Sequence, residues 1–206
     1  MCQCHDHGSC LGCRDAVTRR RFLQGVGATA AATVGLAPAR SAAEEDRNGK
    51  VRVAAVFLEN TKVRESWPYP NFDAQGRQQE ILASLKGGCP GVEFVPVTVE
   101  QPDEVRKAIA LKDQVDGYLV YVLTLAWSLR KPIIEIGRLG KPMVVADEFL
   151  GGCGVFLTGF SELCRLGLPA AAVSTTRLAD LVAVARQFAD VRKPGVTPAL
   201  FARKCN

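Results

Sequence analysis

The chain is poor in histidine. Both of its histidines, His5 and His7, lie near the N-terminus, and residues 44–206 contain none. Histidine is the commonest general base at neutral pH and the commonest metal ligand. Its absence excludes a Ser/His or Cys/His nucleophile pair from the body of the chain. Catalysis there would have to use carboxylates, lysine, tyrosine or a cofactor.

Three other features are missing. No basic stripe with interleaved aromatic residues is present, so we expect no nucleic-acid partner. The formal charge of +5 falls to +2 once the five Arg and two Asp of residues 1–43 are set aside. No apolar run reaches the roughly 20 residues that span a bilayer, so we expect no stable membrane span. Neither a Gly-Lys-Ser/Thr loop nor Gly-x-Gly-x-x-Gly after the first strand is present, which excludes the familiar phosphate loops.

A short motif near the N-terminus resembles the twin-arginine (Tat) export signal. A small-residue apolar run, 25–36, follows it, and small-x-small patterns at 37–39 and 41–43 suit a signal peptidase. The resemblance implies the Tat translocase as a partner and export to the periplasm or cell exterior of a bacterium. The alternative, an uncut membrane anchor, is disfavoured because the run is short. The motif residues are Arg19, Arg20, Phe22 and Leu23.

Before the motif, the chain carries six soft metal ligands within twelve residues. Short spacers let thiolates and imidazoles converge on one ion, which predicts zinc or an iron–sulfur cluster in the precursor. The alternatives are a Cys-rich leader that holds no metal and a start site placed too early. The six residues are Cys2, Cys4, His5, His7, Cys10 and Cys13.

The rest of the chain alternates strand and helix patterns. We divide the sequence into a leader with signal peptide (1–43), a linker (44–50), an α/β domain (51–193) and a C-terminal tail (194–206) that resembles a linker more than a docked terminus. Apolar runs predict strands at 51–58, 92–99, 118–123, 142–146 and 170–174. Helical patterns predict helices at 72–85, capped by Asn71, and at 101–111, 132–139, 155–166 and 178–191.

This βα rhythm predicts the fold class. Strands buried on both faces indicate a five-stranded parallel sheet between two helical layers, a flavodoxin-like or Rossmann-like three-layer α/β sandwich. Pro96 cannot donate to a ladder, so we expect its strand at an edge.

Ligands of open α/β sheets bind beyond the carboxyl ends of the strands, which selects a rim of polar and aromatic residues. Tryptophan faces and clustered acids and hydroxyls suit a sugar or polyol. Two adjacent carboxylates there could also hold Mn²⁺ or Mg²⁺ weakly. The alternative is ordinary loop or helix-capping chemistry, above all for Asp147 and Ser174. The rim consists of Asn60, Trp67, Thr124, Trp127, Asp147, Glu148, Ser174 and Arg177; no catalytic residue is assigned.

One rim segment has a different explanation. The run 151–154 contains Cys153 between glycines, and no histidine of the body can activate that thiol. We therefore favour a structural tight turn.

Two segments carry a family resemblance. Residues 116–127 and 140–152 are similar to the N-terminal α/β part of fucose/arabinose isomerase-like proteins, over about 51–193. The resemblance implies a sugar-related domain. In that family, metal-dependent isomerisation uses Glu, Asp and His ligands in a later domain with no counterpart here.

We therefore expect an exported, catalytically incomplete domain that binds a small sugar or polyol. The alternatives are a metal-dependent aldose/ketose isomerase, a partner-dependent subunit or fragment of one, and a non-enzymatic interaction domain, alone or as an oligomer. Fold analogy by itself does not decide between them.

Overall fold

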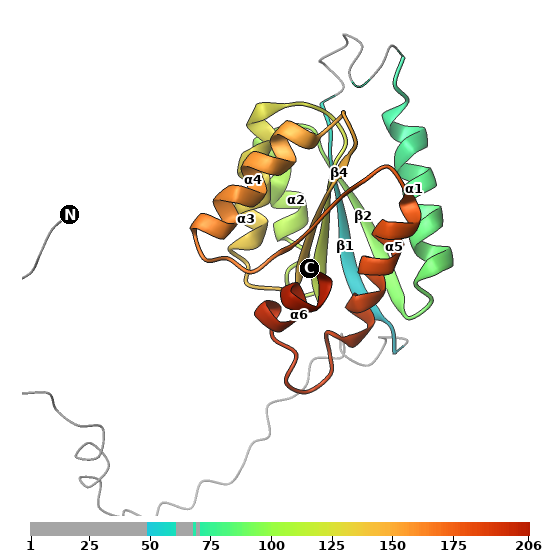
Figure 1. The fold of residues 1–206 in the computed structure, drawn as a ribbon, viewed down its shortest axis with the longest axis vertical. Helices are drawn as coiled ribbons and strands as arrows, with labels where there is room; N and C mark the ends of the chain where they lie inside the picture. The colour runs from blue at the N-terminus through green and yellow to red at the C-terminus, as the bar shows by residue number, and fades with distance from the viewer. Residues whose placement is uncertain (1–48, 61–67, 69–70) are drawn as a thin grey trace, which may run out of the picture. The chain divides into compact units, whose positions relative to one another are not determined.

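Five segments of the chain form one parallel sheet, and helices connect them. The computed structural model describes residues 49–60, 68 and 71–206 (Figure 1). The strands are β1 (Val51–Leu58), β2 (Val92–Val99), β3 (Gly117–Val122), β4 (Met143–Glu148) and β5 (Ala171–Thr175). The α-helices are α1 (Ala74–Gly88), α2 (Val105–Ile109), α3 (Arg130–Gly137), α4 (Cys153–Arg165), α5 (Leu178–Ala185) and α6 (Pro198–Cys205), and the 3₁₀ turns next to them are η2 (Pro102–Glu104), η3 (Trp127–Leu129) and η4 (Arg186–Asp190).

The strand order is β2-β1-β3-β4-β5, with every pairing parallel. This is the flavodoxin-like order, in which the chain reverses direction across the sheet between β1 and β3. Helices α1 and α5 lie on one side of the sheet and α2, α3 and α4 on the other (Figure 1). The predicted three-layer fold is therefore confirmed, and Pro96 lies on the edge strand β2 as expected.

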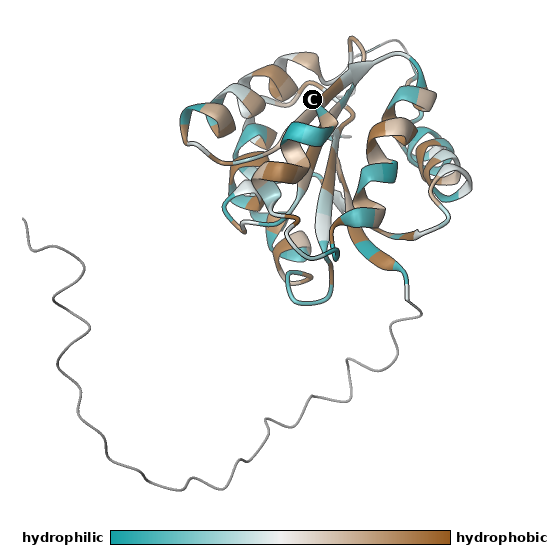
Figure 2. Ribbon diagram, turned by 60° about the horizontal axis from the view of Figure 1, so that its bottom comes forward, coloured by the Kyte–Doolittle hydropathy of each residue, from teal (hydrophilic) through white to brown (hydrophobic). Residues whose placement is uncertain are grey.

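The core divides into two apolar clusters, one on each face of the sheet. Alternate strand residues point to opposite faces, so Phe57 and Tyr121 pack under α1 and α5, whereas Val56 and Val120 pack under α3 and α4. All six residues of β3 are buried. The strands accordingly form a hydrophobic centre with polar residues on the outer helix faces (Figure 2).

The start of α1 differs from the prediction. Its N-cap is Asp73, whose carboxylate accepts a hydrogen bond from Gly76 N at 2.8 Å. Asn71, the predicted cap, instead has a left-handed backbone with φ 59°. Asparagine tolerates that conformation better than most residues, so it serves in the turn before the helix.

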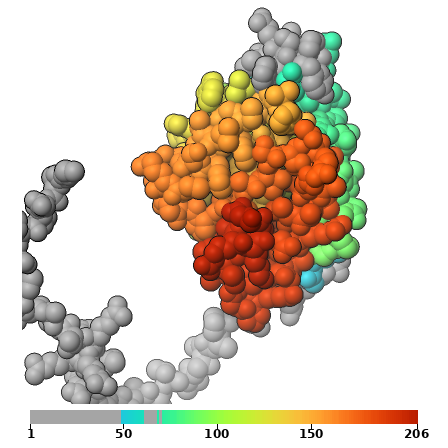
Figure 3. Space-filling view, viewed as in Figure 1, coloured from blue at the N-terminus to red at the C-terminus, as the bar shows by residue number. Residues whose placement is uncertain are grey.

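The C-terminal segment packs on the core, and the prediction of an undocked end is wrong. Thr197 caps α6 by accepting from Leu200 N, and Pro198 occupies the first helical position. Phe201 is 1% exposed and its ring centroid lies 4.7 Å from that of Phe188. Figure 3 shows the C-terminal segment, in dark red, lying against the rest of the domain.

The described residues contain no helix that combines the length and apolar character needed to cross a bilayer. In the same part of the chain, the four cysteines are free thiols: Cys89, Cys153, Cys164 and Cys205.

Candidate functional site at the carboxyl ends of the strands

The carboxyl ends of β1 and β3 adjoin at the point where the strand order reverses. Leu123 N donates to Leu58 O at 2.8 Å, which extends the β1–β3 pairing past the end of β3. One step further, Asn60 N donates to Thr124 Oγ1 at 2.8 Å. The structure thus brings together two residues of the predicted rim at the topological switch point, where this fold class binds its ligands.

Strand β4 extends further than predicted, and the two acids that were expected to share a site lie within it. Asp147 and Glu148 belong to the strand rather than to the loop after it. Neighbours on a strand point to opposite faces, so Glu148 lies on the α1 side and Asp147 on the α4 side. The two carboxylates therefore do not fit a shared divalent ion. Among the described residues, no group of three or more His, Cys, Asp or Glu side chains could hold a metal ion.

Glu148 is held by two donors on its own face of the sheet. Its Oε2 accepts from Arg77 Nε and from the Tyr121 hydroxyl, each at 2.9 Å. Burial, and next the negative charge of Glu148, raise the pKa of Tyr121 far above its ordinary value, so the phenol stays protonated and donates. Burial opposes the charge on Arg77, but its bonds to Glu148 and Glu80 raise its pKa as well. Hydrogen bonds to charged groups stabilise by about 1.5–3 kcal/mol each.

Glu59, directly after β1, lies on the same face and is 6% exposed. Gln78 Nε2 donates to its Oε2 at 2.7 Å, and Gln78 Oε1 in turn accepts from Thr98 Oγ1 at 3.1 Å. Burial raises the pKa of Glu59; the Gln78 bond opposes this rise, and the charge of Glu100 adds to it. Among the described residues, its carboxyl is thus oriented by a neutral amide, and no cation is bonded to it.

The register places Glu59 and Glu148 at one level of the sheet, two strands apart. Phe57 pairs with Tyr121, and Tyr121 pairs with Ala146, so the residues two further along β1 and β4 lie level with each other. Two strand spacings are about 10 Å. Each carboxylate has one oxygen fixed by a side chain of α1 and a second oxygen, Oε1, that no described residue hydrogen-bonds.

Among the predicted site residues that the structure describes, Asp147 is the most buried, with 1% exposure. Burial raises its pKa. Ser174, its register partner on β5, lowers this pKa in part, but the hydroxyl does not meet hydrogen-bond geometry, and both carboxylate oxygens lack a partner among the described residues. Neither residue caps a helix, because α4 is capped by Gly152 and α5 by Arg177.

The remaining predicted rim residues do not join this cluster. Trp127 is 61% exposed, and its ring lies against the first turn of α4, where a Cβ on Gly154 would come within 3.0 Å of it. Arg177 is bonded to Asp180 on its own helix, at 3.0 Å. Trp67 lies outside the described residues, as do the predicted leader ligands and the Arg19–Leu23 export motif.

The glycines before α4 allow close approach of two backbones. A Cβ on Gly152 would lie 2.1 Å from Val122 O, and one on Gly151 would lie 2.5 Å from Leu123 O. No side chain fits at Gly151 or Gly152, so these two glycines make the tight connection that was predicted for the segment.

Sequence reasoning missed Arg77, Gln78 and Tyr121. Tyr121 lay inside an apolar run that indicated core. Arg77 and Gln78 were two polar residues in the second turn of a helix, and only the packing of α1 over the strand ends directs them toward the carboxylates. An available signal was the strand alternation, which places Tyr121 on the face of Glu59.

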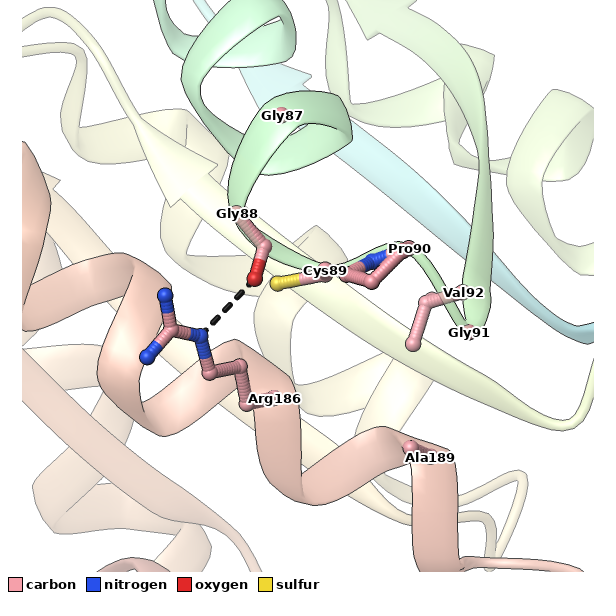
Figure 4. Close-up of a pocket in the computed structure, with 8 residues that line it drawn as sticks. All are labelled: Gly87, Gly88, Cys89, Pro90, Gly91, Val92, Arg186 and Ala189. Atoms are coloured by element: carbon pink, nitrogen blue, oxygen red, sulfur yellow. Dashed lines mark hydrogen bonds between the residues drawn. The ribbon is translucent and has the colours of Figure 1, made fainter.

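A pocket of about 490 Å³ lies near the amino end of β2, between the end of α1 and η4 (Figure 4). Arg186 Nε donates to Gly88 O at 2.8 Å across it, and the thiol of Cys89 faces the same gap. Burial raises the pKa of Cys89, and the nearby Arg186 opposes the rise. This pocket lies away from the carboxyl ends and was not predicted.

No protein-family model, curated protein or solved structure matches this chain.

Proposed function

We propose that this chain is an exported, sugar-isomerase-like α/β domain that binds a small sugar or polyol at the carboxyl ends of its strands, and that it is catalytically incomplete. The observation that carries the proposal is the pair Glu59 and Glu148. Both are fixed from α1, both lie on one face, and each keeps Oε1 without a hydrogen bond from a described residue. Two positioned acceptors about two strand spacings apart suit a ligand that carries several hydroxyl donors.

The electrostatics support a neutral, hydroxyl-rich ligand. Glu148 is compensated by Arg77, and Glu59 is buried beside the like charge of Glu100, so the described part of the cluster offers no free cation to an anionic group. The absence of histidine from the body, and the opposed directions of Asp147 and Glu148, disfavour the metal-dependent isomerase alternative.

A thermal-shift panel on the full chain tests the proposal, with pentoses, hexoses, 6-deoxy sugars, polyols and sugar acids, each with and without manganese. A ligand at 100 times its Kd stabilises a fold by about 2.7 kcal/mol, which is several degrees in Tm. We expect a shift without manganese, its loss in Glu148→Gln, and its retention in Glu93→Gln, a half-exposed control on β2. A shift that requires manganese would favour the isomerase alternative. A flat panel would reject the sugar-binding proposal in favour of a partner-dependent domain.

A further inference from the structure

The two carboxylates of the proposed site differ in what surrounds them. Glu148 has a guanidinium and a phenol on one oxygen, so its negative charge is compensated. Glu59 is more deeply buried, and its one hydrogen bond from a described side chain comes from the amide of Gln78. Two carboxyl groups in contrasting environments, within one site, are the usual arrangement when one group exchanges protons and the other remains charged.

The groups around Glu59 favour its neutral form. From the end of β2, Glu100 adds a like charge. From α1, Gln78 is neutral, and the guanidinium of Arg77 is bonded to carboxylates on β4 and on its own helix. From β3, Tyr121 is a protonated phenol whose hydroxyl donates to β4. No described cation is bonded to Glu59, and burial removes most of the hydration that would stabilise its charge.

Gln78 fixes the orientation of this carboxyl. The amide is itself oriented, because its oxygen accepts from Thr98 while its nitrogen donates to Glu59 Oε2. The Thr98–Gln78–Glu59 chain therefore holds Oε2 in place and leaves Oε1 for another donor. A carboxyl positioned in this way, with a pKa raised chiefly by burial, is suited to gain or lose a proton when its surroundings change.

We propose that Glu59 is the proton-exchanging residue of this site: a hydroxyl of a bound polyol or sugar donates to Glu59 Oε1, and binding releases the carboxyl proton of Glu59 to solvent. No bond within the ligand forms or breaks. This inference rests on the proposed function, because it names how the same site recognises a hydroxyl. Gln78 and Thr98 are positioning residues for this carboxyl.

Titration of the ligand-free protein is the first test. We would follow the side-chain carboxyl resonances of ¹³C-labelled glutamate in the full chain by NMR and identify Glu59 from its loss in Glu59→Gln. Glu59 should titrate above an ordinary glutamate, because burial raises its pKa. Its pKa should rise further in Gln78→Leu, which removes a bond that stabilises the charge, and stay unchanged in Glu93→Gln. An ordinary pKa in the wild-type chain would overturn the proposal without relying on any variant, and Thr98→Val offers a milder change if Gln78→Leu does not fold.

Calorimetry with ribitol and D-ribose is the second test. The binding enthalpy, measured in buffers of different ionisation enthalpy, should show that binding releases a proton. As pH rises between the bound and the free pKa of Glu59, the Kd should fall by up to about tenfold for each pH unit. Glu59→Gln should bind with no proton release. Binding of either probe by the wild-type chain without proton release would overturn this inference and leave the proposed function standing. Failure of both probes and of the whole sugar panel would overturn the proposed function, and the hydroxyl recognition inferred here with it.

Discussion

Replacing Asp147 by Asn should stabilise the fold at neutral pH and flatten the pH dependence of its stability. Asp147 is 1% exposed and neither oxygen has a hydrogen-bond partner among the described residues. Its pKa in the folded chain is raised from the ordinary 3.8, chiefly by burial. The change to Asn keeps the shape of the side chain and removes the charge that burial opposes.

The sign follows from proton binding. Above pH 3.8 the unfolded chain loses this proton, whereas the folded chain retains it until the raised pKa is passed. The folded state therefore binds more protons in this window, and its stability falls as pH rises through it. The contribution of Asp147 is fully present below the unfolded pKa and is lost above the folded one. An asparagine side chain does not titrate, so wild type and Asp147→Asn should have similar stability in acid and diverge as pH rises.

The size of the effect follows from burial. An unsatisfied buried polar group costs about 1–3 kcal/mol, and more when it is charged. Asparagine leaves its own amide poorly satisfied, so we expect a net gain of about 1–3 kcal/mol at neutral pH, or about 2–4 °C in Tm for each kcal/mol in a domain of this size. Glu59 also has a raised pKa, so part of the decline with pH should persist in Asp147→Asn.

Thermal unfolding followed by circular dichroism from about pH 4 to about pH 8 would measure this. Asp103→Asn is the matched control, because the Asp103 side chain is 71% exposed. Parallel Tm profiles of wild type and Asp147→Asn across the whole range would refute the reasoning, since they would show that Asp147 titrates alike in the folded and unfolded chains.

Two further predictions concern packing. Gly152→Ala should lower Tm strongly, because its Cβ would lie 2.1 Å from a β3 carbonyl oxygen, whereas a Cβ on Gly87 meets nothing within 4 Å; similar Tm values for the two alanine variants would contradict the close approach. Phe201→Ala should cost about 3–5 kcal/mol in chemical unfolding, because this ring is 1% exposed within the core. The exposed Lys204, changed to Ala, should cost far less, and equal losses would mean that α6 is not docked.

Much of the fold could be predicted because its signals are local. Apolar runs gave the bounds of β1 and β2 as the structure has them, and the βα rhythm gave the parallel sheet. The edge position of β2 followed from one residue, Pro96. Proline has no backbone N–H, and a strand with neighbours on both sides would lose a ladder hydrogen bond at that position. These features depend on backbone hydrogen bonding and side-chain period, which neighbouring residues specify.

Other features depended on contacts between distant segments. The segment after Pro194 had no strong apolar pattern, and only its fit against Phe188 and the sheet shows that Phe201 belongs to the core. The end of β4 was misplaced because Asp147 and Glu148 are charged, and charge usually indicates a loop. Here the ladder to Ser174 and Thr175 continues through both residues, so pairing with β5 overrides the local signal.

Strand alternation explains why the predicted rim was only partly a site. Alternate residues of a strand point to opposite faces, and the same alternation can be continued just past the strand ends. It places Glu148 on the α1 side of the sheet. The predicted rim residues that it places on the α4 side are Asn60, Thr124, Asp147 and Ser174. Asp147 and Glu148, which the prediction had paired, therefore lie on opposite faces because they are neighbours on one strand. The carboxyl that shares the face of Glu148 is 89 residues earlier in the chain, at Glu59, and α1 fixes both with consecutive residues of one helical turn. For this fold, a candidate site is better read from strand parity and register than from clusters of polar residues along the chain.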